Sequence, residues 1–138
     1  MLNILNRLLR VAGLEVRRRP PGTHGSAKEE VATLPATGPE IGSVLISYIP
    51  DDVLKTEGDV SSSHTHYWEC RQMARSFASA GFSVDVIDFA NDTFVPRKRY
   101  DVLVSARTEL ERLASHVPET CFKVAHLDTA HFLTHNAN

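Results

Sequence analysis

The sequence predicts an α/β fold: a Rossmann-like, mainly parallel sheet with flanking helices. Short apolar runs alternate with segments of helical periodicity from residue 43 onward, and turn or loop residues separate them. The long helical segment passes into the next strand through Gly81, as in a tight αβ unit. Parallel strands need crossover connections, which are right-handed, so this alternation indicates neighbouring strands that run in the same direction.

The residues in front of this alternation are expected to lie outside the sheet. Residues 1–16 carry leucines at helical spacing beside arginines, which predicts a short basic amphipathic helix. Two roles stay open for it: peripheral contact of residues 1–19 with an anionic membrane surface, or a terminal helix that frays or docks on a partner domain. Residues 17–42 are rich in Pro, Gly, Thr, Ala and Ser and predict a flexible linker.

The sheet domain is expected to span residues 43–138. An apolar run from Val44 to Ile49, ended by Pro50, is typical of a strand buried on both faces. At the other end, Asp128 begins a helical segment within which the sequence stops. The domain is therefore interpreted as the truncated front half of a larger enzyme.

Between these ends the sequence predicts two helices and three further strands. Ser62 or Ser63 caps a helix of about five turns, and Gly81 ends it with a left-handed residue. The further strands and the second helix are expected at residues 82–89, 101–105, 122–127 and 108–116, in that order.

Composition and charge exclude several classes of protein. The 138 residues carry a formal net charge of −2, and the charge balance gives no sign of a nucleic-acid partner. Cys70 and Cys121 lie in different predicted elements without metal-ligand spacing, so both are expected to be buried free thiols. The first residues lack the features of a secretory signal, and no apolar run approaches the roughly 20 residues of a membrane span. A cytoplasmic protein is expected.

Two histidine-rich segments are predicted at one edge of the sheet, because ligands bind such sheets outside the carboxyl ends of the strands. Residues 64–69, HTHYWE, open the first helix of the domain, and residues 126–131, HLDTAH, close the last strand. The loop after the first strand lacks the GxGxxG pattern that brings a pyrophosphate against the backbone. No nicotinamide or flavin cofactor is therefore expected.

These segments allow more than one chemistry. Imidazole and carboxylate groups are ligands of zinc and iron, but their positions here mix strand and helix, although His131 and His135 could share a helix face. Contacts to a polar substrate, or ordinary capping and surface roles, are favoured over a metal site. Trp68 has two interpretations, either a core residue that packs the helix on the sheet or an aromatic wall for a sugar ring.

Together, the strand and histidine motifs resemble the amino-terminal domain of bacterial glycosyltransferases with the GT-B fold of two Rossmann-like domains. The chain is similar to the family-one/four type, which builds cell-surface polysaccharides. The motifs are residues 44–48, 64–69, 81–88, 100–104 with Arg107, and 126–136, within a resemblance that covers residues 43–138. The 81–88 stretch is common to many Rossmann-like domains, whereas HTHYWE paired with HLDTAH is more distinctive.

The resemblance implies transfer of a sugar from a nucleotide-sugar donor to a hydroxyl of a glycan or lipid-linked acceptor, without a tightly bound metal or other cofactor. In such enzymes the amino-terminal domain receives the acceptor and a carboxyl-terminal domain binds the donor. The donor half has no counterpart here, so this chain alone is expected to be inactive.

The resemblance also implies a set of cleft residues, in which a histidine acts as a base or orients a hydroxyl. The catalytic candidates are His66 and His131. The substrate-binding candidates are His64, Trp68, Glu69, Arg107, His126 and Asp128. Two alternatives from other classes stay open: a non-catalytic Rossmann-like binding module, and a metal-dependent hydrolase that uses the histidines.

Overall fold

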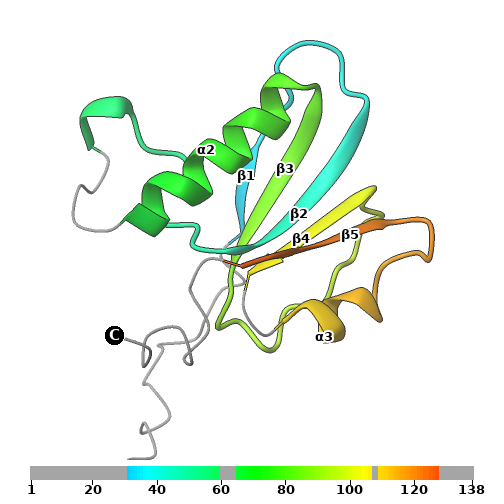
Figure 1. Cartoon of the computed structure of the whole chain (residues 1–138). Helices are drawn as coiled ribbons and strands as arrows, with labels where there is room; N and C mark the ends of the chain where they lie inside the picture. Colours follow the sequence, from blue (N-terminus) through cyan, green and yellow to red (C-terminus); the bar gives the residue numbers. More distant parts are fainter. Residues whose placement is uncertain (1–30, 60–64, 107–108, 128–138) are drawn as a thin grey trace, which may run out of the picture.

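The computed structural model describes residues 31–59, 65–106 and 109–127. These residues form a five-stranded sheet with the strand order β1-β3-β2-β4-β5 (Figure 1). The strands are β1 (Ala32–Leu34), β2 (Gly42–Tyr48), β3 (Phe82–Asp88), β4 (Val102–Ala106) and β5 (Phe122–His126). All neighbouring strands are parallel except the antiparallel edge pair β1 and β3. The prediction of a mainly parallel α/β sheet is confirmed.

Strand β1 corrects the prediction of a flexible linker at residues 17–42 in its described part, residues 31–42, and the rest of that range lies outside the described residues. Leu34 pairs with Val84 at the edge of the sheet, and Ala32 and Leu34 pack against the core on the face that also holds the first helix of the sheet. The main chain of Thr37 donates a hydrogen bond to the Ala78 carbonyl at 2.9 Å. A three-residue strand has too little pattern to stand out in a Pro- and Gly-rich segment, and pairing with β3 is what stabilises it.

Within the described part of the chain, two α-helices cover opposite faces of the sheet. Helix α2 (Thr65–Ser79) lies along β3, and its side chains join the core formed by one face of β2, β3 and β4 (Figure 1). Helix α3 (Leu110–Ala114) buries Leu113 against the other face. It is shorter than the predicted 108–116, since a turn at 115–117 follows Ala114 and residues 107–108 lie outside the described residues.

Small residues let α2 approach the sheet closely. Cys70, Ala74 and Ala78 recur every four residues on the buried side of the helix. Gly81 then ends the helix with a φ of +98°, a left-handed conformation that glycine adopts without strain. Both cysteines are buried free thiols in the structure, as the sequence predicts.

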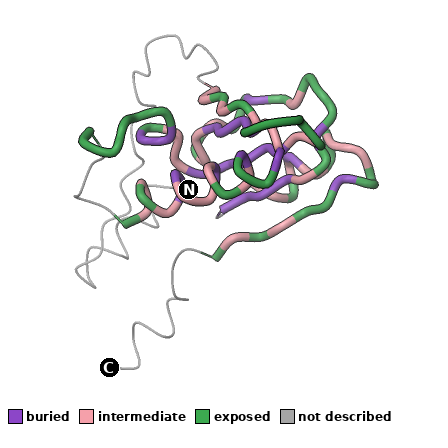
Figure 2. Tube along the Cα trace, turned by 90° about the horizontal axis from the view of Figure 1, so that it is seen from above, coloured by how far each residue is buried: buried purple, intermediate pink, exposed green. Residues whose placement is uncertain are grey.

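Burial decreases from the centre of the sheet toward β5. The inner strands β2, β3 and β4 are mostly buried, whereas the residues of β5 are exposed or half-buried (Figure 2). The chain leaves β2 for β3 on one side and later enters β4 on the other side of β2. The carboxyl ends of β2 and β4 therefore flank the topological switch point, which is the usual place for a ligand in an open α/β sheet.

Candidate functional site at the carboxyl end of the sheet

Four polar side chains meet at the carboxyl end of the sheet, on the face that α2 covers. They are Tyr48, His66, Glu69 and His126, and the group is called the strand-end cluster below. Tyr48 ends β2, His126 ends β5, and the other two residues lie in the first turn and a half of α2. Three chain segments far apart in sequence therefore supply one site.

The strand register explains how β2 and β5 meet across β4. Ser47 aligns with Ser105 and Ala106 aligns with His126, so Tyr48, Ala106 and His126 form one row across three strands. Ala106 occupies the central position of this row, and its methyl group is the smallest side chain of any L-residue. The rings of Tyr48 and His126 consequently meet edge to face, with centroids 5.4 Å apart.

Hydrogen bonds set the protonation pattern on the Tyr48 side of the cluster. The Tyr48 hydroxyl donates to Glu69 Oε2 at 2.9 Å, and its oxygen lies 2.9 Å from Nδ1 of His66. Because the phenol proton is committed to the carboxylate, the phenol oxygen accepts from His66, which places a proton on Nδ1. The chain of donors therefore runs from His66 through Tyr48 to Glu69.

On the other side of the cluster, Glu69 faces the second histidine. Its Oε1 atom lies 3.1 Å from Nε2 of His126, whose side chain is 22% exposed. The N–H direction of this buried nitrogen is too poorly aligned for a hydrogen bond, so the contact is electrostatic. The carboxylate therefore lies within ion-pair distance of the imidazole ring.

The structure brings together three of the predicted site residues and separates a fourth. His66, Glu69 and His126 are in the cluster, as expected for residues at one edge of the sheet. Trp68 is 56% exposed and does not pack the helix on the sheet. At helical spacing it points away from the side of α2 that carries Cys70, Ala74 and the cluster, so the core interpretation is wrong and the sugar-wall interpretation stays a prediction.

The other candidates, His64, Arg107, Asp128 and His131, lie outside the described residues. Tyr48 and Ala106 were missed in the sequence. The one available signal for Tyr48 is a hydroxyl-bearing ring at the end of an otherwise aliphatic strand, a position where a buried phenol needs a partner. Nothing local distinguishes Ala106, because its importance depends on the neighbours that the sheet register gives it.

Comparison with protein-family models, curated proteins and solved structures finds no match for this chain. Within the described ranges, no three His, Cys, Asp or Glu residues are grouped so that they could hold a metal ion. None of the helices formed by these residues is long and apolar enough to cross a membrane. The properties of the strand-end cluster therefore have to be judged from its own geometry.

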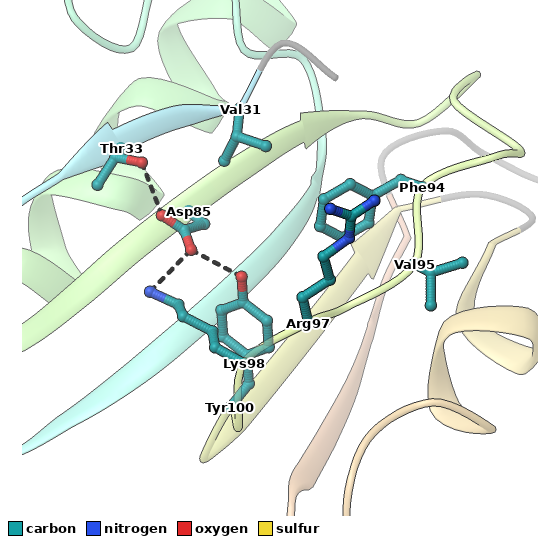
Figure 3. A pocket seen from close by; sticks show the side chains of 8 residues that line it. All are labelled: Val31, Thr33, Asp85, Phe94, Val95, Arg97, Lys98 and Tyr100. Atoms are coloured by element: carbon teal, nitrogen blue, oxygen red, sulfur yellow. Dashed lines mark hydrogen bonds and ion pairs between the residues drawn. The ribbon is translucent and has the colours of Figure 1, made fainter. Parts of the chain in front are cut away.

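A second concave region lies on the opposite face of the sheet, near its β1 edge (Figure 3). Asp85 forms its polar base and accepts hydrogen bonds from Thr33 Oγ1 at 2.8 Å and the Tyr100 hydroxyl at 2.7 Å. The ammonium group of Lys98 lies 2.8 Å from the same carboxylate and 5.1 Å from the centre of the Tyr100 ring. Apolar side chains, among them Phe94 and Val95, line the rest of this open pocket.

The three donors determine the charge of the pocket. Burial raises the pKa of Asp85, but hydrogen bonds from Lys98, Tyr100 and Thr33 outweigh burial and hold the pKa below its usual value. Burial and the neighbouring carboxylate raise the pKa of Tyr100, which keeps the phenol protonated. With its donors satisfied internally, this group ties the segment before β4 to β1 and β3, and it is best understood as structural.

Proposed function

We propose that this chain is the acceptor side of a GT-B-type glycosyltransferase, which transfers a sugar from a nucleotide-sugar donor to a hydroxyl of a glycan or lipid-linked acceptor. The observation that carries the proposal is the strand-end cluster. It holds two imidazoles against one carboxylate, beside the switch point of the sheet. Such a group can orient a hydroxyl and accept its proton, as acceptor activation requires.

The geometry gives the two histidines different roles. Nδ1 of His66 is engaged with Tyr48, which holds the ring against the end of β2. Nε2 of His126 faces Glu69, so its Nδ1 atom is the nitrogen left to approach a substrate hydroxyl. When the acceptor oxygen forms its bond to the anomeric carbon and the nucleoside diphosphate departs with the bonding electrons, the hydroxyl proton passes to this nitrogen. Glu69 stabilises the resulting imidazolium.

The second histidine-rich segment and the donor half complete the proposal. His64, Arg107, Asp128 and His131 lie outside the described residues and remain candidates from the sequence alone. The donor is held by a further Rossmann-like domain, which is not among the described residues. The dyad of Glu69 and His126 takes up the acceptor proton, and the charge of the departing diphosphate is stabilised by the donor domain.

The test is sugar transfer by the complete polypeptide. Radiolabelled nucleotide-sugars are incubated with soluble glycans and with polyprenyl phosphates, and products are separated from donor. The variants His126→Gln and Glu69→Gln should lower kcat at least about a hundredfold, within the range for general base catalysis. His116→Gln, an exposed histidine on the α3 side, is the matched control.

Three results would contradict the proposal. Transfer at the wild-type rate by the His126 variant would remove its role as the proton acceptor. Absence of transfer from every donor, combined with saturable binding of a glycan, would identify a non-catalytic binding module instead. Hydrolysis that depends on added zinc would favour the hydrolase alternative.

A further inference from the structure

Arg71 on α2 is the largest fully buried side chain among the described residues. Its Nη2 atom donates to the carbonyl oxygen of Lys55 at 3.1 Å and lies 3.1 Å from Glu57 Oε1. Its Nε atom is buried and has no hydrogen-bond partner. A buried guanidinium with an unused donor is costly unless an anion compensates it.

A second arginine converges on the same carboxylate. Arg75 lies one helical turn after Arg71 and donates from Nη1 to Glu57 Oε1 at 2.7 Å. Two guanidinium groups at this spacing repel each other, and a single carboxylate oxygen lies between them. The nearby ammonium group of Lys55 is paired with Asp52, so it does not take part in this charge balance. The pair of arginines therefore retains an excess of one positive charge.

The carboxylate that fills this position is weakly held by its own segment. Glu57 is 78% exposed on its side chain and belongs to a single turn of 3-10 helix, η1 (Glu57–Asp59), in which no residue is buried. Hydrogen bonding to Arg71 lowers the pKa of Glu57, so the group is an anion at neutral pH. This segment leaves the carboxyl end of β2, and η1 is drawn beside the amino-terminal half of α2 (Figure 1).

We propose that Arg71 and Arg75 form a binding site for a phosphate group, which the carboxylate of Glu57 occupies while no ligand is bound. A phosphate dianion carries the charge that two guanidinium groups require, and its oxygens fit the planar fork of each. Binding displaces Glu57 and releases the 55–59 segment from α2. The site is independent of the strand-end cluster, and it stands whether or not the protein transfers sugars.

The experiment is calorimetric titration of the full chain with inorganic pyrophosphate. Removal of the internal competitor in Glu57→Gln should tighten binding about tenfold relative to wild type, equivalent to ~1.4 kcal/mol. The double variant Glu57→Gln/Arg75→Gln should lose this gain. Glu111→Gln, which removes one exposed carboxylate from α3, is the matched control and should behave like wild type. Glu57 and Arg75 are both exposed enough for their variants to fold, and thermal melting verifies this.

Three outcomes would overturn the proposal. The first is equal pyrophosphate affinity in wild type, Glu57→Gln and Glu111→Gln, and the second is a pyrophosphate affinity of Glu57→Gln/Arg75→Gln as high as that of Glu57→Gln. Hydrogen exchange tests the displacement itself, since amides of residues 55–59 should exchange faster in wild-type protein saturated with pyrophosphate. Unchanged exchange would show that Glu57 stays in place and that the site does not exist as described.

A second arm identifies the source of the phosphate. Vesicles of phosphatidylcholine with and without phosphatidic acid are sedimented with each variant. Arg75-dependent binding to the phosphatidic acid vesicles would identify a lipid phosphate, whereas pyrophosphate binding without sedimentation would identify a free or nucleotide-borne phosphate.

Discussion

Glu69 on α2 approaches His126 at the end of β5, with its Oε1 atom 3.1 Å from Nε2 of the imidazole. The two residues are far apart in sequence, because the chain forms β3, β4 and α3 between α2 and β5. Their contact depends on the row formed by Tyr48, Ala106 and His126, in which the small middle residue lets the two outer rings meet.

The size of residue 106 should control this contact. Ala106→Leu is expected to push the Tyr48 and His126 rings apart and to lower the free energy of unfolding by about 1–3 kcal/mol, because Ala106 is 1% exposed and a larger side chain there must displace its neighbours. Nuclear Overhauser effects between the two rings, followed together with urea unfolding, measure both effects. Ala106→Gly should keep the ring contact. Persistence of the contact in the leucine variant would contradict the spacing role of Ala106.

The Tyr48 hydroxyl should be coupled energetically to Glu69. Tyr48→Phe removes a phenol that donates to the carboxylate at 2.9 Å, and we expect a loss of about 1–2 kcal/mol in the free energy of unfolding. The Glu69 side chain is 36% exposed and can take up water, which limits the loss. Urea unfolding of the two single variants and of Tyr48→Phe/Glu69→Gln forms a double-mutant cycle. Strictly additive effects would show that the hydrogen bond contributes nothing.

Asp85 should make stability depend on acid pH. Its folded-state pKa is lowered by its three donors, so the ionised carboxylate stabilises the fold above the unfolded-state pKa of about 4, and this contribution is lost as the pH falls through the folded-state value. Urea midpoints between pH 7 and pH 3 should therefore fall more steeply for wild type than for Asp85→Asn. Asp92→Asn, a change at an exposed carboxylate, should retain the wild-type slope. Parallel curves for wild type and Asp85→Asn would refute the prediction.

The Cys70 thiol should be inert in the folded protein. Burial raises its pKa to about 12, and the side chain is fully buried against the sheet, so the reactive thiolate is scarce and shielded at pH 8. Burial also raises the pKa of Cys121. An aromatic disulfide reagent should therefore react with neither cysteine until urea unfolds the chain, at which point both react. Rapid labelling of Cys70 under native conditions would show that α2 separates readily from the sheet.

Local pattern was sufficient for the inner strands and for the end of α2. The continuous apolar run at 44–49 corresponds to β2, and the alternation after Gly81 corresponds to β3. A strand buried on both faces requires apolar residues at nearly every position, so the sequence pattern identifies it. The sequence predicts that the two histidine-rich segments lie at one edge of the sheet. The positions of His66 and His126, the histidines of these segments that the structure describes, agree with this prediction. Edge strand β1 and the exposure of Trp68 were not predictable in this way, since each depends on which neighbours the fold supplies.

The sequence by itself therefore determined the fold class, the parallel direction of the main strands and the residue types available at their carboxyl ends. Hydrophobic periodicity and the positions of glycines involve residues that are neighbours in sequence, so the sequence is sufficient to predict the elements that they specify. The tertiary structure alone decided that Ala106 separates Tyr48 from His126, that Glu69 lies between two histidines, and that Arg71 and Arg75 share Glu57. These relationships arise from strand register and from packing between distant segments, and such contacts leave no periodic signal in the chain.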